Sequence, residues 1–411
     1  MREPTLSSRR GFLKQLLALG GSATAFGFSP AAWLERRAVR IERIEVFPVT
    51  YPMRGRFKFF EGPEGSPIGR STVIVKITAD DGTVGWGESV PIPKWSYETV
   101  ESVTTTIRNY LAPELIGQPV FDLAGAHAIM ERNIAPSFST GAPIAKAGVD
   151  IALHDLIGKL MNQPLAQIWG RKPGGTITLS WTCNPARLED LDPLIDEGLK
   201  RGYKHFNVKV SPDPKFDLEL CRRVKQRVPD GFLWADANGG YDLATALEVA
   251  PKLADIGVDV LEQPLPAHRL SGYRELKRQG ALPILMDEGV VSPAVLIELI
   301  RLDVLDGVAM KPARCGGLLS ARRQIEILED AGLMILASGL TDPDISLAAS
   351  LALYGAYSQP FPAALNGPQF VSASVLKSPL TPKNGTLAVP TGPGLGIEVD
   401  EQKIRALMIN V

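Results

Sequence analysis

Five charged residues of types that bind metal ions or transfer protons recur at nearly constant intervals through the second half of the chain. Two are lysines and three are acids, and successive members are 27, 26, 25 and 24 residues apart: Lys209, Asp236, Glu262, Asp287 and Lys311. Each follows a short apolar run, and the interval is about the length of one strand, one helix and two short loops. The spacing therefore predicts that each charge ends its own strand in a chain of βα units.

The three acids have the chemistry of a metal site. Carboxylates that converge on one mouth repel one another, and a divalent cation is the usual way to stabilise them. Because the set contains no His or Cys, Asp236, Glu262 and Asp287 favour Mg²⁺, with Mn²⁺ as the alternative, over zinc. Any one acid alone would more often be a helix cap or a surface ion pair. We expect Asp287 to reach the metal and Glu288 to lie behind it, because successive strand residues point to opposite faces.

The two lysines would face each other across this metal. A lysine near a cation and inside a partly dry pocket has a lowered pKa, so it can act as a base near neutral pH. An isolated lysine would more often pair with an acid, but Lys209 and Lys311 are placed symmetrically. They predict removal of a proton next to a metal-bound carboxylate, with the metal stabilising the enediolate that forms.

Strands and helices alternate from residue 176 to the end of the chain. In a closed barrel the active site lies at the carboxyl ends of the strands, where all five charges fall. No GxGxxG motif follows the first strand, so a barrel is favoured over an open doubly wound sheet. We expect eight parallel strands, within residues 176–183, 205–210, 232–238, 258–264, 282–288, 307–312, 333–339 and 363–368.

Residues 41–170 predict a separate α+β domain. Strand-like runs around an Asp81-Gly82 turn are followed by three or four helices, and we expect the last helix to cover residues 145–170 and to end at a glycine. The loop at residues 54–69 is rich in Gly, Pro and aromatic residues. It is either a mobile flap or a variable connection.

Composition excludes several classes of partner. The 44 lysines and arginines against 45 acids leave a formal net charge of −1, so nothing indicates nucleic acid or a membrane surface as a partner. The three cysteines contain no CxxC pair, which argues against a zinc ribbon or a disulfide scaffold.

The N-terminus resembles a twin-arginine export signal. The Arg9-Arg10 pair is followed by Phe12 and by a moderately apolar run without charge, too short and glycine-rich to span a membrane comfortably. We expect residues 1–32 to be a signal peptide that engages the twin-arginine export machinery. The mature protein would be periplasmic, without stable membrane association. An amphipathic first helix, or a short anchor if cleavage fails, is the alternative.

An ordered set of motifs carries a family resemblance. The motifs are GWGE at 85–88, DIALHDLIGK at 150–159, DAN at 236–238, EQP at 262–264, DE at 287–288 and KPARCGG at 311–317. The chain resembles the enolase superfamily, in its mandelate racemase and muconate lactonizing enzyme branch, and closest to the muconate lactonizing subgroup. The likeness covers nearly everything after residue 41.

This resemblance implies a fold and a site. The fold would be a modified TIM barrel, (β/α)₇β, at residues 171–411, below an N-terminal α+β capping domain to which the C-terminal segment returns. Superfamily members use a Lys or His base beside Mg²⁺. The implied roles are metal binding by Asp236, Glu262 and Asp287, and opposed acid/base catalysis by Lys209 and Lys311.

Two positions depart from the family pattern. The family often has Lys-x-Lys on the second strand, where this chain has Asn207 before Lys209. An amide can donate a hydrogen bond to a substrate carboxylate but adds no charge, so Lys209 should be less acidified. Related dipeptide epimerases often carry Asp-x-Asp on the eighth strand, where this chain has Asn366.

An Asp342-Pro343-Asp344 segment follows the seventh strand instead. The aspartates could meet a substrate ammonium group, but Pro-Asp at a helix start is more often an N-cap, which we favour. The residues predicted to bind the substrate or to support the site are Asn207, Asn238, Glu288, Asp342, Asp344 and Asn366.

The predicted activity is Mg²⁺-dependent abstraction of the α-proton of a small carboxylate through a metal-stabilised enediolate, by an enzyme that forms a homo-oligomer, as is common in the family. Two opposed bases favour a racemase or epimerase. A dehydratase or a cycloisomerase of the same superfamily is the alternative. From another class, the uncharged Asn207 is the one feature that leans toward an exported, non-catalytic binding protein.

Overall fold

The structure is a computed structural model of the chain. It describes residues 39–62, 68–137, 140–210, 212–357 and 359–411. The predicted export signal, residues 1–32, lies outside these ranges, as does the middle of the predicted flap, residues 63–67. Within the described ranges, no helix combines the length and the apolar character needed to cross a membrane.

The N-terminal domain is built on an antiparallel sheet. Its strands β1 (Ile41–Tyr51), β2 (Arg70–Ala79) and β3 (Val84–Ser89) lie in sequence order. Helical segments follow, with α4, η3 and α5 forming one continuous stretch: α3 (Pro93–Ser96), α4 (Val100–Thr106), the π-helical η3 (Ile107–Leu111), α5 (Ala112–Leu115), α6 (Leu123–Asn133), α7 (Pro143–Leu160) and α8 (Leu165–Ile168).

Helix α7 joins this domain to the barrel, and almost all of its residues are buried. The two glycines of the GWGE motif allow β3 to lie directly against it, because a Cβ at Gly87 would be 1.9 Å from the carbonyl oxygen of Gly148. The predicted single helix over residues 145–170 is wrong at its end. The chain turns after Leu160, because Pro164 has no N–H to donate and disfavours helical backbone before it.

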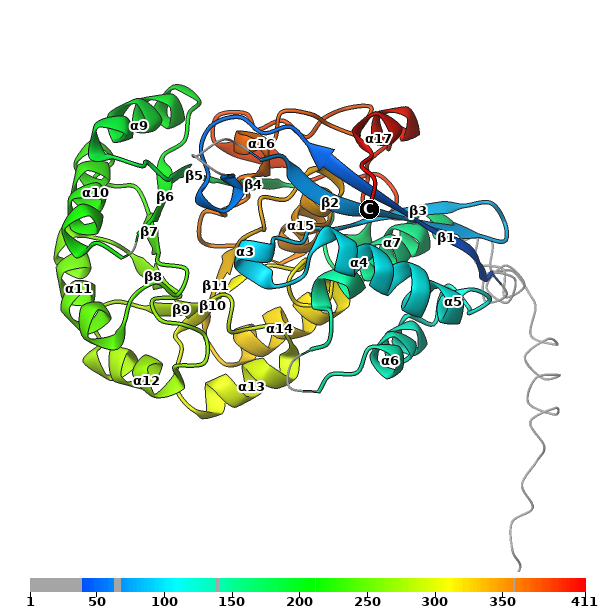
Figure 1. Cartoon of the computed structure of the whole chain (residues 1–411), viewed down its shortest axis with the longest axis horizontal. Helices are drawn as coiled ribbons and strands as arrows, with labels where there is room; N and C mark the ends of the chain where they lie inside the picture. Colours follow the sequence, from blue (N-terminus) through cyan, green and yellow to red (C-terminus); the bar gives the residue numbers. More distant parts are fainter. Residues whose placement is uncertain (1–38, 63–67, 138–139, 211, 358) are drawn as a thin grey trace, which may run out of the picture.

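The C-terminal domain is a ring of seven parallel strands with helices outside (Figure 1). In sequence and spatial order the strands are β5 (Ser180–Cys183), β6 (His205–Lys209), β7 (Leu233–Asp236), β8 (Val260–Glu262), β9 (Ile284–Met286), β10 (Gly307–Met310) and β11 (Met334–Ala337). The predicted α/β fold, a modified TIM barrel under an α+β domain, is confirmed.

Two of the eight predicted strands differ from expectation. The first, residues 176–183, divides into β5 and a short β4 (Thr176–Thr178), which pairs with β12 (Thr386–Ala388) outside the ring. The eighth, residues 363–368, is reduced to single bridges. Ala363 pairs with Leu179 beside β5, and Ala364 pairs with Ser338 beside β11, so this segment links the two edges of the sheet.

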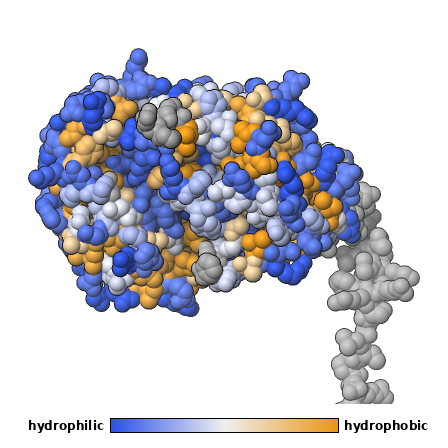
Figure 2. Space-filling model, viewed as in Figure 1, coloured by the Kyte–Doolittle hydropathy of each residue, from blue (hydrophilic) through white to orange (hydrophobic). Residues whose placement is uncertain are grey.

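The outer helices alternate with the strands, and the chain then returns to the first domain. Met408 bridges to Val49 of β1, and Lys76 of β2 pairs with Glu401 at 2.5 Å. On the face shown in Figure 2, most residues along the edge are hydrophilic, and the hydrophobic residues form separate patches. The helices are η4 (Leu188–Asp190), α9 (Leu191–Lys200), α10 (Pro214–Arg227), α11 (Leu243–Ile256), α12 (Leu270–Gln279), α13 (Pro293–Arg301), α14 (Leu318–Asp330), α15 (Asp344–Ala356), α16 (Gly367–Phe370) and α17 (Glu401–Leu407).

Two buried charges of the sheet hold the first domain against the mouth of the barrel. The guanidinium of Arg70 donates to the carbonyl oxygens of Leu340 at 3.0 Å and Thr341 at 3.3 Å, in the loop after β11. The carboxylate of Glu88 accepts from the backbone N–H groups of Ile345 at 3.2 Å and Ser346 at 3.1 Å. Because Ile345 and Ser346 lie in the first turn of α15, Glu88 caps that helix from the other domain.

Candidate active site

The carboxyl ends of β6 to β10 bring the five predicted charges together. Lys209, Asp236 and Glu262 are the last residues of three adjacent strands and stand in register with one another. Asp287 follows β9 directly, and Lys311 follows β10. Residues in register on parallel strands point the same way, so the regular spacing in the sequence becomes one row of side chains.

The two lysines lie at opposite ends of this row of acids. Lys209 Nζ forms an ion pair with Asp236 Oδ2 at one end. Lys311 Nζ lies 3.1 Å from Glu262 Oε1 and 2.8 Å from Asp287 Oδ1 at the other. All five side chains are at least nine-tenths buried. The arrangement is that of two ammonium groups on either side of a carboxylate cluster.

Arg314 joins the cluster, although it is absent from the residues predicted from the sequence. Its Nη1 donates to Asp287 Oδ1 at 2.7 Å, and its buried Nε and Nη2 have no hydrogen-bond partner. A turn closed by the bond from Arg314 N to the Lys311 carbonyl at 3.0 Å returns the chain over the mouth. The signal was present in the KPARCGG motif, where Arg314 follows Lys311 by three residues.

Glu288 and Asn238 form a second layer around Asp236. Asn238 donates from Nδ2 to Asp236 Oδ2 at 3.1 Å and to Glu288 Oε1 at 3.2 Å. Strand β9 ends at Met286, so the alternation that was expected to turn Glu288 away from Asp287 does not operate there. Glu288 therefore reaches the same mouth as the acids of the row.

Aromatic residues of the first domain cover the mouth. The Trp95 ring centre lies 5.5 Å from Lys209 Nζ and 5.5 Å from Lys311 Nζ, and Trp95 Nε1 donates to Glu288 Oε1 at 2.5 Å. Phe59, from the predicted flap, stacks on Trp95 with ring centres 4.5 Å apart. Cations over aromatic faces are stabilised, and the rings exclude water from the acids.

Burial and mutual repulsion dominate the electrostatics of the acids. Burial raises the pKa of Glu262 well above its ordinary value, and the charges of Asp236 and Asp287 raise it further. Burial also raises the pKa of Glu288 to about 7, with Asp287 contributing in the same direction. At Asp236 burial acts upward too, but the charges of lysines, Lys209 foremost, outweigh it and lower the pKa.

Lys311 differs from expectation. A lowered pKa was predicted for both lysines, yet the pKa of Lys311 is raised. Burial lowers it, but the neighbouring charges of Asp287 and Glu262 more than compensate. In this arrangement the acids act on the ammonium directly, whereas the lowered pKa is expected for a lysine beside a bound cation and stays a prediction.

The donor set in the mouth fits a hard divalent cation. In the described part of the chain no three His, Cys, Asp or Glu side chains form a ready-made metal site, because ammonium and guanidinium groups occupy oxygens of the row. Asp287 Oδ2 and Glu288 Oε2 are nevertheless buried without a partner. Carboxylate oxygens alone, crowded enough to oppose their own ionisation, are a donor set suited to Mg²⁺. Binding of Mg²⁺ stays a prediction.

Asn207 and Asn366 lie beside the row, on its β5–β6 side. Asn207 stands in register with Thr182 of β5, and Asn366 Nδ2 donates to Thr182 Oγ1 at 3.3 Å. Both amide atoms of Asn207 and the amide oxygen of Asn366 are buried without a partner. Unpaired buried polar atoms are costly, so these amide groups are open to a polar partner, and the predicted contact with the substrate stays a prediction.

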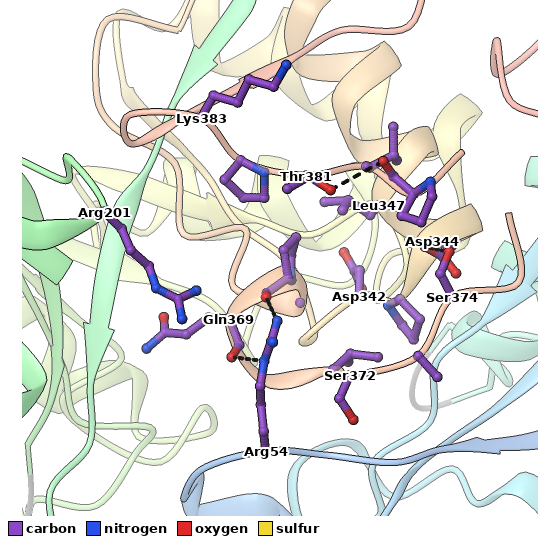
Figure 3. A pocket seen from close by; sticks show the side chains of 18 of the residues that line it. Arg54, Arg201, Asp342, Asp344, Leu347, Gln369, Ser372, Ser374, Thr381 and Lys383 are labelled. Atoms are coloured by element: carbon purple, nitrogen blue, oxygen red, sulfur yellow. Dashed lines mark hydrogen bonds between the residues drawn. The ribbon is translucent and has the colours of Figure 1, made fainter. Parts of the chain in front are cut away.

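Asp342 and Asp344 lie elsewhere. Asp342 accepts from Leu340 N at 3.1 Å and Ser350 Oγ at 3.2 Å. Asp344 accepts from Val375 N at 2.6 Å. Both line a separate groove of about 840 Å³, shown in Figure 3 with Arg54 on its other side.

The predicted N-cap role of these aspartates is wrong, because Glu88 supplies the cap of α15 and neither aspartate does. Among the described residues, neither Asp342 nor Asp344 forms an ion pair or a hydrogen bond with the charged row. They are therefore not brought into the candidate site.

Comparison with known proteins identifies the family. The model for the mandelate racemase / muconate lactonizing enzyme N-terminal domain matches residues 65–170, and the enolase C-terminal domain-like model matches residues 193–403. A chloromuconate cycloisomerase, CbnB of Cupriavidus necator, is 34% identical over 342 residues, which cover 82% of this chain and 91% of that protein. The chain belongs to the mandelate racemase/muconate lactonizing enzyme family. The predicted family is confirmed.

Members of the family with different reactions are similar to this chain. The N-succinyl-L-Arg/Lys racemase of Bacillus cereus is 28% identical over 382 residues, covering 90% of this chain and 98% of that protein. Its solved structure superposes with a TM-score of 0.83 at 27% identity, covering 90% and 98% of the two chains. The muconate lactonizing enzyme of Klebsiella pneumoniae gives 0.81 at 28% identity, covering 90% and 100%. This family member is an enolase-superfamily isomerase or lyase, as predicted.

Proposed function

We propose that the protein is a Mg²⁺-dependent racemase or epimerase of a small carboxylate. The observation that carries the proposal is the position of Lys209 and Lys311 at opposite ends of one buried row of acids. Inversion at carbon requires a base on one face of the substrate and an acid on the other.

The residues of the mouth would have separate roles in this reaction. Asp236, Glu262 and Asp287 would hold Mg²⁺, and the bound cation would supply positive charge against the negative charge that develops on the substrate carboxylate. One lysine, as the neutral amine, accepts the proton from the α-carbon, and the other, as the ammonium, donates a proton to the opposite face. Trp95 and Phe59 keep water from the reacting carbon.

Cycloisomerisation is the second candidate. The chloromuconate cycloisomerases among the relatives favour it, and so does the asymmetry of the two lysines. Lys311 contacts two acids, whereas Lys209 contacts one. A reaction that moves a proton on one face of the substrate needs only one of the two lysines. Elimination of a β-substituent, as in a dehydratase, has the same requirement.

Exchange of solvent deuterium into substrate separates these reactions. Acid sugars, N-acyl amino acids, dipeptides, proline derivatives and muconates would be incubated with Mg²⁺ in D₂O and followed by NMR. A racemase incorporates deuterium at the α-carbon of recovered substrate and loses inversion in both Lys209→Met and Lys311→Met. A cycloisomerase or dehydratase forms product and depends mainly on one lysine.

The exposed Lys252, on α11 outside the barrel, supplies a matched control as Lys252→Met. Its exchange should equal that of the wild type. If both active-site variants also exchange like the wild type, the assignment of the two lysines is wrong.

We also propose that the chain is exported through the twin-arginine pathway to the periplasm. The Arg9-Arg10 pair and the uncharged apolar run after it support the proposal. Replacement of both arginines by lysine should retain the protein in the cytoplasmic fraction of a cell that has this pathway. Unchanged export of the double variant would contradict it.

A further inference from the structure

A buried aspartate of the first domain contacts the turn that carries Lys311 and Arg314. Asp150 is the first residue of the DIALHDLIGK motif and lies fully buried on α7. Its Oδ2 accepts a hydrogen bond from the backbone N–H of Leu318, the first residue of α14, at 2.5 Å. Because the KPARCGG motif ends at Gly317, this contact joins two motifs that are far apart in the sequence.

Gly317 allows the carboxylate to approach the start of α14. A Cβ at this position would be 2.2 Å from Asp150 Oδ2, and the φ of +102° lies in the left-handed region that favours glycine. Gly317 is also the N-cap residue of α14 and has no side chain to cap the helix. The carboxylate of Asp150 therefore supplies the cap from the other domain, and its negative charge is favourable at a helix N-terminus.

Two histidines hold this carboxylate in place. His127 of α6 donates from Nε2 to Asp150 Oδ1 at 2.6 Å. His154, one turn further along α7, donates from Nδ1 to the carbonyl oxygen of Asp150 at 2.9 Å, and the same nitrogen lies 3.3 Å from Asp150 Oδ2. Burial raises the pKa of Asp150, but the charge of His154 and the hydrogen bonds from both histidines outweigh it and lower the pKa. The carboxylate is therefore ionised and is held by groups from three helices.

The turn is fixed at its other end by the barrel. Lys311 follows β10, which pairs with a strand on either side. Within the turn, the N–H of Arg314 donates to the Lys311 carbonyl at 3.0 Å, and the N–H of Gly317 donates to the Pro312 carbonyl at 2.9 Å. Asp150 thus holds the far end of a short, internally bonded turn whose near end belongs to the sheet.

We propose that Asp150 is a positioning residue, which sets Lys311 and Arg314 against the acids of the row by anchoring this turn. The inference rests on the proposed function, in which Lys311 transfers a proton. Displacement of a reacting group by about 1 Å can lower a rate about 10²-fold. Loss of Asp150 should therefore impair Lys311 while leaving Lys209, on the opposite side of the mouth, in place.

The side-chain nitrogen signals of the two lysines test the proposal without a substrate. Both ammonium groups are buried and paired, so NMR of ¹⁵N-labelled protein in a chelator should detect them. Their signals are assigned by their absence in Lys311→Met and Lys209→Met. We expect Asp150→Ala to shift the Lys311 signal and to leave the Lys209 signal unchanged. Asp150→Asn should shift it less, because the amide oxygen can still accept from Leu318 N.

Asp155→Ala controls for a general loss of stability. Asp155 lies on the same helix and is equally buried, and it accepts from Trp86 N at 2.8 Å and from Leu395 N at 2.9 Å, both outside the turn. This variant should keep the Lys311 signal. The proposal is overturned if Asp150→Ala leaves that signal unchanged or shifts both lysine signals equally, or if Asp155→Ala shifts the Lys311 signal as much.

Gly317→Ala disturbs the same contact from the side of the turn. Its Cβ would clash with Asp150 Oδ2, so the turn must move while Asp150 keeps its two histidines. We expect the same selective shift of the Lys311 signal. If Asp150→Ala does not fold, Gly317→Ala and Asp150→Asn decide the question, and an unchanged Lys311 signal in both overturns the proposal.

Deuterium exchange shows whether the proposal and the reaction fail separately. In a racemase each lysine takes the proton of one enantiomer, and Lys311→Met identifies the enantiomer that Lys311 serves. Asp150→Ala should slow exchange into that enantiomer about tenfold or more and into the other less than about twofold, and an equal fall in both overturns the proposal. If no carboxylate exchanges but the Lys311 signal shifts selectively, the proposed reaction is wrong and the role of Asp150 stands. If exchange occurs and Asp150→Ala does not change it, the reaction stands and the role of Asp150 is wrong.

Discussion

The two sides of the barrel mouth differ in the number of ion pairs that they contain. On the β9–β10 side, Lys311 and Arg314 share Asp287, and Lys311 also holds Glu262. On the β5–β6 side, Lys209 has Asp236 alone, and its neighbour Asn207 is neutral and unpaired. The first side is a network of shared ion pairs, and the second has a single ion pair beside a neutral amide. Two acids are therefore fixed by cations on the β9–β10 side, whereas on the β5–β6 side both buried amide atoms of Asn207 lack a partner.

The comparison predicts unequal losses when either lysine is removed. Lys311→Met breaks two buried ion pairs and leaves Glu262 without a cation and Asp287 with Arg314 alone, so we expect it to lower the free energy of unfolding by about 3–5 kcal/mol without metal. Lys209→Met should lower it less, because one acid loses a partner. Both should reduce deuterium exchange about 10²–10⁴-fold. Chemical denaturation in the presence of a chelator measures the loss of stability, and NMR measures the loss of deuterium exchange. Equal losses of stability in the two variants would contradict the difference between the two sides of the mouth.

The contact between the two domains includes Glu88, which should make the free energy of unfolding depend on pH. Burial raises its pKa from the ordinary 4.5 to about 7, so the folded state favours the protonated acid. The stability that comes from this preference is complete below about pH 4.5 and is lost as the pH rises through about 7, by about 3 kcal/mol. Glu88→Gln can still accept from the N-terminus of α15 and should remove this part of the pH dependence.

Denaturant titrations between pH 5 and 8 measure the effect at Glu88. The exposed Glu248, on the outside of α11, gives the control Glu248→Gln, whose profile should follow that of the wild type. A Glu88→Gln profile that also follows the wild type would show that Glu88 does not titrate in this range.

A substitution at Arg314 tests the β9–β10 side with a smaller expected effect than Lys311→Met. Arg314→Gln removes the guanidinium from Asp287 but leaves Lys311 in place, so the acid loses one of its two cationic partners. We expect deuterium exchange or Mg²⁺ affinity to fall about 10–100-fold, the range for a residue that orients a metal ligand. The exposed Arg301 provides Arg301→Gln as the control. A change below twofold at Arg314 would mean that Lys311 alone positions Asp287.

A substitution at Asn207 tests the β5–β6 side, where we expect the smallest effect. Asn207→Leu removes two buried unpaired polar atoms at similar volume, so it should stabilise the protein by about 1 kcal/mol while lowering kcat/KM about tenfold. Thermal unfolding and substrate kinetics give the two values. A loss of stability would mean that Asn207 serves the fold rather than the ligand.

The barrel and its row of acids and lysines could be predicted from the amino-acid sequence alone. Parallel βα units place every strand's carboxyl end at one mouth, so residues spaced by about one unit meet there whatever the details of the loops. Lys209, Asp236 and Glu262 stand in register for this reason. The family motifs, each short, marked the same strand ends.

The surroundings of that row depend on the tertiary structure. Phe59 and Trp95 reach the mouth because Arg70 and Glu88 dock the first domain on it, and no local pattern records that docking. The predicted eighth strand is reduced to two bridges, one to each edge of the sheet. After β11, Asp342 accepts a hydrogen bond from the nearby Leu340 N, whereas Asp344 accepts one from Val375 N, a distant partner that the local sequence does not indicate.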